Sequence, residues 1–231
     1  MKTLAFITLV LLTSVSAIAQ NDEGWVSKEY QISDFSNIYL EGGYKVYLSQ
    51  GDKVSLTAKT TDEDMFDVLK VSSRDDELSL VMNRDYLSYR RIRLYITVKD
   101  LDQIKAEGGL SLESEGYLDL KDIQLHVQGG ARVNLKMKAR DIDVIGEGGV
   151  LITLNGVADQ LSVRLSGAGH VDADELKAEE VKINIEGVGT GSVYATKKLY
   201  TQIDGVGKVW YKGNPIVTKD IDGLGSVSSN D

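Results

Sequence analysis

The 231-residue sequence contains no cysteine, and this absence excludes several classes of protein. Disulfide scaffolds, thiolate zinc sites, cysteine nucleophiles, Cys-ligated iron–sulfur clusters and a lipidated N-terminal Cys all need sulfur that the chain lacks. Only two histidines are present, His126 and His170, and neither stands in a His-Glu-x-x-His or His-x-Glu context. The sequence therefore predicts no metal centre, no bound cofactor and no catalytic residue.

Positive charge is also scarce. The chain has 26 Lys and Arg against 35 Asp and Glu, a formal net charge of −9, and it has no long basic run. Phosphate backbones are poor partners for such a chain, so we predict no nucleic-acid binding. Hydrophobic residues make up 42% and charged residues 26%, a balance typical of a chain that folds around a core.

One long apolar run is present, at the N-terminus. Lys2 precedes apolar residues 4–15, and Ala17-Ile18-Ala19 forms a small-x-small cleavage site. The run is shorter than the ~20 residues that a membrane-spanning helix needs. We predict a cleaved signal peptide at residues 1–19, a polar lead-in at 20–24 and no later transmembrane segment. The protein is then exported, to the periplasm, the outer-membrane surface or the medium.

Glycine, in contrast, is abundant, with 23 residues against a single proline. Many glycines stand in a recurring unit, in which a polar residue precedes Gly-Gly or Gly-x-Gly. The first glycines of successive units, from Gly108 onward, are 18–21 residues apart, a period typical of repeat architectures. We expect each first glycine to form a corner with positive φ, packed closely against its neighbours. These glycines are Gly42, Gly108, Gly129, Gly148, Gly167, Gly187, Gly205 and Gly223.

Alternating apolar residues flank the glycines. Ile123-Leu125-Val127 precede one glycine and Val133-Leu135 follow it, so that each segment has one apolar face, as in a strand. A unit this short buries its apolar face only by stacking on copies of itself. The predicted fold is all-β, a single-stranded parallel β-helix or β-solenoid with rungs of about 18–21 residues, expected to be right-handed. An antiparallel hairpin sandwich is the structural alternative.

Residues 25–100 are less regular. The segment Thr61 to Leu69 is acidic and predicts a short helical turn or a loop, and Asp75-Asp76-Glu77 predict a hairpin-type turn. Irregular terminal rungs of this kind cover the unpaired edge of a first coil. We predict one domain at 25–231, with irregular first rungs at 25–100 and regular repeats at 101–231.

The order of these segments resembles a bacterial family. Glu41-Gly42-Gly43 with the following Tyr44 to Leu48, the segment Phe66 to Val71, Leu94 to Val98 and the repeated glycine units are similar to the putative auto-transporter adhesin, head GIN domain family. The resemblance covers nearly the whole mature chain. It implies a right-handed β-helix-like fold, export in bacteria of the Bacteroidetes type and no established enzymatic activity. Its motifs are structural glycines and core positions, so it implies no functional residue.

Two groups of side chains are candidates for a ligand surface. Alternation places Arg91, Arg93 and Tyr95 opposite the apolar residues of their strand, in a strip suited to an acidic sugar or a lipid phosphate. Tyr47 and Trp210 fall out of step with the apolar positions, which predicts exposed rings able to stack on sugars. The alternatives are arginines paired with nearby acids and aromatic rings in ordinary cross-strand packing.

Most units also place an acidic residue just before the glycine: Glu107, Glu147, Glu186, Asp204 and Asp222. Stacked carboxylates about 5 Å apart repel one another, and calcium or protonation relieves the repulsion. Gln128 and Ser166 interrupt this column, which favours a solvated polar corner over a calcium ladder.

The sequence thus predicts an exported, non-enzymatic β-solenoid, an adhesin-like or envelope-associated binding module. Regularly spaced side chains on one face suit a repetitive ligand such as a polysaccharide, and a cell-surface protein is the other partner considered. A polysaccharide lyase or hydrolase is one alternative, by analogy of fold. A structural envelope-assembly protein is another, because the last rung, Val217 to Ser229, has no obvious cap and leaves a homo-oligomer through the solenoid ends open.

Overall fold

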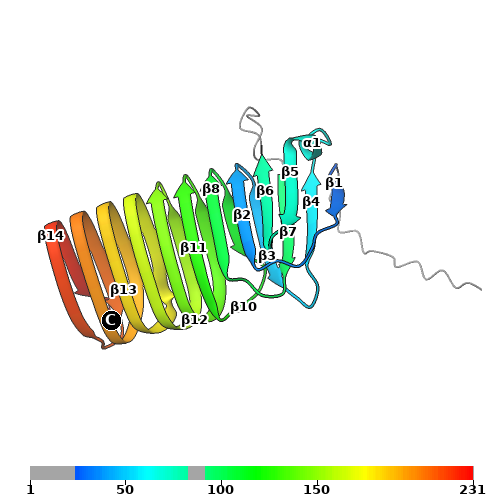
Figure 1. Cartoon of the computed structure of the whole chain (residues 1–231). Helices are drawn as coiled ribbons and strands as arrows, with labels where there is room; N and C mark the ends of the chain where they lie inside the picture. Colours follow the sequence, from blue (N-terminus) through cyan, green and yellow to red (C-terminus); the bar gives the residue numbers. More distant parts are fainter. Residues whose placement is uncertain (1–23, 83–91, 231) are drawn as a thin grey trace, which may run out of the picture.

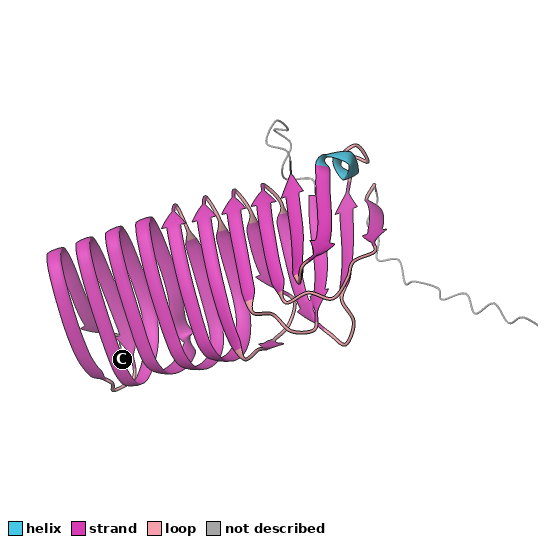
Figure 2. Ribbon diagram, viewed as in Figure 1, coloured by secondary structure: helices cyan, strands magenta, loops and turns pink. Residues whose placement is uncertain are grey.

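The computed structural model describes residues 24–82 and 92–230, and strands dominate them (Figure 2). Within these residues the single helix is α1 (Met65–Val68), inside the segment predicted as a helical turn or loop. The strands lie side by side along a coil, with β1 near one end and β14 at the other (Figure 1). The predicted all-β solenoid is confirmed, and its handedness stays a prediction.

Each regular rung consists of a strand, a glycine corner and a second strand. In one rung β2 (Asn37–Gly42) leads into the corner and β3 (Lys45–Gln50) leaves it. In the next rung β8 (Gln103–Gly108) and β9 (Ser111–Ser114) do the same, paired in parallel with β2 and β3. We call the side built from strands that lead into the corners the pre-glycine face, and the other side the post-glycine face.

Later rungs follow without irregular insertions. They are formed by β10 (Leu118–Asp119), β11 (Asp122–Gly129), β12 (Arg132–Gly148), the 62-residue β13 (Leu151–Lys212) and β14 (Ile216–Ser229). The parallel register places equivalent residues of successive repeats beside one another, as in Gly129 beside Gly148 and Gly205 beside Gly223. A side-chain type that recurs in the repeat therefore forms a row along the solenoid.

Most of an N-terminal cap lies in the long interval between Gly42 and Gly108. Its inner rung is β6 (Glu77–Met82) and β7 (Ile92–Val98), which pair in parallel with β2 and β3. The rung of Gly42 consequently lies between the cap and the repeats, although it comes first in the sequence. Its place explains why the Gly42 unit stands apart from the others in the chain.

Antiparallel strands complete the cap. β5 (Leu69–Arg74) pairs with β6, β4 (Ser55–Thr60) with β7, and β1 (Val26–Tyr30) with β4. The predicted turn joins β5 to β6, and its residues Asp75 and Asp76 have φ values of 54° and 61°. Positive φ at both positions is the geometry of a two-residue hairpin turn.

The core is a continuous apolar column between the two faces. Side chains alternate strictly along β7, where Ile92 and Ile96 are buried while Arg93 and Tyr95 are half-buried on the outer side. One hydrophobic cluster extends from Phe35 in the cap to Val227 in the last rung. Burying such side chains stabilises by about 25 cal/mol for each Å² of apolar surface removed from water, which explains why short units persist only as a stack.

Ion pairs join neighbouring rungs at the corner opposite the glycines. The partners are one rung apart in sequence: Asp100 and Lys121, Asp119 and Lys138, Asp122 and Arg140, Glu179 and Lys197, and Glu180 and Lys198. All of these side chains are partly exposed, so each pair contributes roughly 0–1 kcal/mol. Their recurrence shows that facing charges on adjacent rungs are usually complementary at this corner.

Some predicted features lie outside the described residues. The signal peptide and all but the last residue of the lead-in fall in residues 1–23, and Arg91 falls in residues 83–91. In the part of the chain that the structure describes, no helix has the length and hydrophobicity needed to cross a bilayer.

Candidate ligand-binding surface

Basic and aromatic side chains meet on the post-glycine face where the cap adjoins the β2–β3 rung. Arg93 and Tyr95 project from β7, and the parallel register places Lys45 beside Arg93 and Tyr47 beside Tyr95 on β3. On the other side of β7, the antiparallel register places Lys59 of β4 beside Arg93. Three strands thus form a row of cations next to a pair of tyrosines.

The rings and cations of this surface are in direct contact. The rings of Tyr47 and Tyr95 are stacked, with centroids 4.9 Å apart and an interplanar angle of 17°. The ammonium of Lys59 lies 5.3 Å from the Tyr95 ring centroid, and the guanidinium carbon of Arg93 lies 4.1 Å from that of Trp25. Such cation–π contacts hold the long side chains in place. We call the group the cationic–aromatic patch: Trp25, Lys45, Tyr47, Lys59, Arg93 and Tyr95.

The patch carries positive charge on an acidic protein. Among the described residues, neither Lys45 nor Arg93 forms an ion pair, and Lys45 is exposed. Burial raises the pKa of Tyr47, Arg93 acts against the rise, and Tyr95 and Glu113 add to it. The Tyr47 hydroxyl therefore stays protonated at neutral pH and is a hydrogen-bond donor. The surface offers cations, stacked rings and a phenol at one place.

The predicted site residues are only partly brought together. Arg93 and Tyr95 lie in the patch, whereas Trp210 lies near the other end of the solenoid, half-buried on β13 with the Lys208 ammonium 4.6 Å from its ring centroid. Trp25 and Lys45 were missed in the sequence. Arg93 and Lys45 are 48 residues apart, and only the β3–β7 register makes them neighbours.

All eight predicted corner glycines have positive φ. In the acidic column beside them, Glu107 lies between Glu41 and Gln128, and Gln128 separates it from Glu147. The ammonium of Lys105 lies 2.8 Å from a carboxylate oxygen of Glu107 and lowers the pKa of that carboxyl. Within residues 24–82 and 92–230, no group of three or more His, Asp or Glu side chains has the geometry of a metal site.

A solenoid that presents fixed rows of side chains along its faces belongs to the class of repeat proteins built for extended binding surfaces. The chain belongs to the family described as putative auto-transporter adhesin, head GIN domain, whose model matches residues 34–215. Membership indicates an adhesin-like, extracytoplasmic binding module. No curated protein matches the chain by sequence.

Solved structures of bacterial proteins share the fold. A putative adhesin from Bacteroides fragilis has 21% identity and a TM-score of 0.83, over 91% of this chain and 99% of that one. A putative adhesin from Parabacteroides merdae has 19% identity and a TM-score of 0.69, over 91% and 98%. A putative lipid binding protein from Parabacteroides distasonis has 23% identity and a TM-score of 0.62, over 91% and 98%. At these identities the likeness concerns the fold.

Proposed function

We propose that the protein is an exported, non-enzymatic binding module whose cationic–aromatic patch recognises an anionic polysaccharide. The observation that carries the proposal is the Tyr47–Tyr95 stack flanked by Lys45 and Arg93. Aromatic rings pack against the apolar face of a sugar ring, and a guanidinium binds a carboxylate or sulfate through paired hydrogen bonds. The patch places aromatic rings beside cationic groups, and an acidic sugar chain needs both for its sugar rings and its negative charges.

The surrounding charge restricts where such a polymer binds. With a net charge of −9, the protein as a whole repels a polyanion. The patch is a local region of positive charge where a polyanion can bind. Binding by exposed cations is screened by salt, over a Debye length of about 8 Å at physiological ionic strength. We therefore expect affinity for an acidic polysaccharide to fall as salt rises, and affinity for a neutral one to be weak throughout.

The test uses the mature chain, residues 20–231, and dextran sulfate with unmodified dextran as the neutral counterpart. Arg93→Gln is expected to weaken dextran sulfate binding by about tenfold, since a charge-assisted hydrogen bond is worth about 1.5–3 kcal/mol. Lys208→Gln is the matched control, because it also removes a cation beside an aromatic ring on the same face. Biolayer interferometry at two salt concentrations measures both variants.

Four outcomes would contradict the proposal. Equal binding of dextran and dextran sulfate would show that charge is not recognised, and equal losses in the two variants would show that the patch is not the site. Release of shortened products from a panel of acidic polysaccharides would establish a lyase or hydrolase instead. Anionic phospholipid vesicles form a parallel arm, and binding to them alone would identify a lipid phosphate as the ligand.

A further inference from the structure

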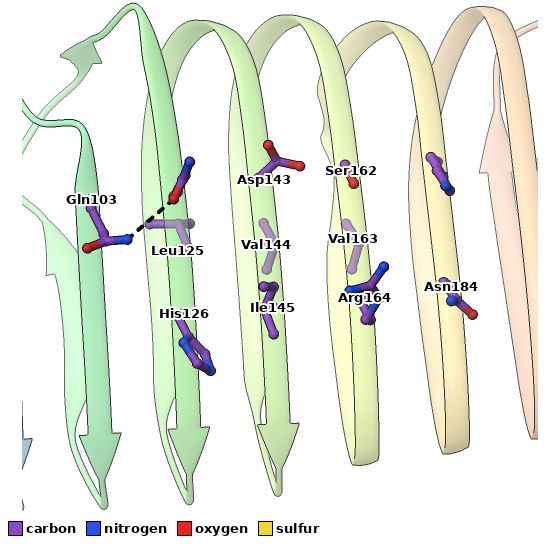
Figure 3. A pocket seen from close by; sticks show the side chains of 12 residues that line it. Gln103, Leu125, His126, Asp143, Val144, Ile145, Ser162, Val163, Arg164 and Asn184 are labelled. Atoms are coloured by element: carbon purple, nitrogen blue, oxygen red, sulfur yellow. Dashed lines mark hydrogen bonds between the residues drawn. The ribbon is translucent and has the colours of Figure 1, made fainter.

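A groove crosses the outer side of the pre-glycine face, on the sheet opposite the cationic–aromatic patch (Figure 3). It spans five successive rungs and has a volume of about 310 Å³. The parallel register places its outward side chains in two rows, and Figure 3 shows them standing on consecutive strands. One row is Gln103, Gln124, Asp143, Ser162 and Lys182, and the other is His126, Ile145, Arg164 and Asn184.

Side-chain size creates the hollow. Asp143 and Ser162 are short, and they stand between the longer Gln124 and Lys182 of the same row. In the other row, Ile145 offers an apolar contact between polar neighbours. The groove therefore combines hydrogen-bonding groups with a small apolar surface, the composition of a site for a polar ring-shaped ligand.

The charged side chains of the groove lack partners of opposite charge among the described residues. Within the described residues, Asp143, Arg164 and Lys182 form no ion pair, whereas facing charges at the corner opposite the glycines pair from rung to rung. Arg164 also makes no cation–π contact with a described ring, and the Lys182 ammonium lies 5.6 Å from the Tyr200 ring centroid. These side chains are thus available to an external ligand.

Two buried polar atoms of other groove residues are also unsatisfied. Nε2 of His126 and Oδ1 of Asn184 are inaccessible to water and have no hydrogen-bond partner among the described residues. The nearest carboxylate oxygen to His126 Nε2 belongs to Glu147, at 3.6 Å, which is beyond hydrogen-bond length. Buried polar atoms without partners are uncommon in folded proteins, and a bound ligand that reorients the side chains removes their cost.

We propose that this groove binds a carboxylated sugar, a uronic acid unit of a glycan, independently of the cationic–aromatic patch. Arg164 and Lys182 hold the sugar carboxylate, because they are cations on adjacent rungs. Asp143 and Asn184 accept hydrogen bonds from hydroxyl groups, and Ile145 packs against the C–H face of the ring. An inorganic anion would be repelled by the Asp143 carboxylate. A neutral sugar would leave Arg164 and Lys182 without a negative partner.

The probe is trigalacturonate, with its carboxyl-reduced counterpart as the neutral control. Titration into ¹⁵N-labelled residues 20–231 is expected to shift backbone amides of the five groove rungs, while shifts of β3 and β7 report binding at the cationic–aromatic patch separately. Arg164→Gln is expected to weaken binding by about tenfold or more. Arg132→Gln removes an exposed arginine outside the groove and is expected to bind as the wild type does.

Ser162→Tyr is a second variant, which fills the hollow with a residue that a strand tolerates well. It is expected to abolish the trigalacturonate-induced shifts of the groove rungs and to keep the wild-type melting temperature. Equal affinity for the reduced sugar, shifts confined to β3 and β7, or unchanged binding in both groove variants would overturn the proposal. Because the shifted amides identify the face, failure of the groove and failure of the patch are separate results.

Discussion

At Gly129 the backbone has a φ of 102°, and a Cβ added there would lie 2.8 Å from the carbonyl oxygen of Gly108 in the neighbouring rung. At Gly130 no atom lies within 4 Å of such a Cβ, and φ is not in the left-handed region. Two adjacent glycines of one repeat unit therefore have different roles. The first allows two rungs to approach at the corner, whereas the second occupies open space.

Gly129→Ala is expected to lower the free energy of unfolding by about 1–3 kcal/mol, because alanine is strained at this φ and its methyl group meets a backbone oxygen. Gly130→Ala, the matched control, is expected to change it by less than about 0.5 kcal/mol or to raise it slightly. Urea unfolding followed by circular dichroism measures both variants. Equal destabilisation in the two would show that the corner responds to any added methyl group.

Single residues were predictable where they follow the repeat. The spacing of the glycines and the alternation of Arg93 and Tyr95 are visible along the chain. The partners of these side chains are not, because Trp25 and Lys45 reach Arg93 only through strand pairing in the cap. The groove is equally hidden in the sequence, since it depends on short side chains such as Ser162 facing longer ones one rung away.

At the scale of single elements, the β5–β6 hairpin shows how a turn can also fasten a neighbouring strand. A carboxylate oxygen of Asp76 accepts a hydrogen bond from the Ser36 amide at 3.0 Å, and the other accepts one from the Asn37 amide nitrogen Nδ2 at 3.2 Å. The side chain of Asp75 bonds to none of the described residues. The turn was predicted from Asp75-Asp76-Glu77. Its hydrogen bonds to Ser36 and Asn37 were not predicted, because these segments are about 40 residues apart in the sequence.

Asp75→Gly is expected to raise the free energy of unfolding by up to about 1 kcal/mol, because glycine adopts positive φ without steric cost. Asp76→Gly gains the same freedom but loses the hydrogen bonds to Ser36 and Asn37, so we expect it to be destabilised by about 1–3 kcal/mol. Differential scanning calorimetry distinguishes the two. A lower melting temperature for Asp75→Gly would contradict the assignment of strain to that position.

For the whole molecule, the two ends of the solenoid differ. The cap closes the N-terminal end with antiparallel strands, whereas no described strand pairs with the outer edge of β14, on which Ile216 and Leu224 are 75% and 77% exposed. Lys219 occupies an inward position, in register with the buried Thr201, and its ammonium donates a hydrogen bond to the Val227 carbonyl at 3.2 Å. A charged residue that points inward at an open edge opposes the addition of another strand.

Lys219→Val is therefore expected to promote association through the C-terminal end, the homo-oligomer that the sequence left open. Sedimentation velocity over a range of protein concentrations is expected to show a concentration-dependent dimer for this variant. Lys177→Val removes the same charge from the exposed side of β13 and is expected to sediment as the wild type does. Identical sedimentation of all three proteins would contradict a protective role for Lys219.

The solenoid as a whole was predictable because its glycine period and alternation repeat in the sequence. The order of its first rungs was not. The sequence predicted irregular first rungs at 25–100 without their order, and the structure places the Gly42 unit between β6–β7 and β8–β9. Sequence periodicity identifies equivalent units, but it does not show which units are neighbours when the chain returns on itself.

The interior position of the β2–β3 rung determines where folding of the solenoid begins and in which direction further rungs are added. The described residues 26–82 and 92–98 form the cap and that rung together, before any repeat is needed. From β11 onward, each rung closes a loop of only about 20 residues onto the rung that precedes it in the sequence, so the entropic cost of each addition is small and nearly constant. A chain that emerges N-terminus first assembles in the order in which it appears. Duplication of a repeat would lengthen both binding faces without changing where folding begins.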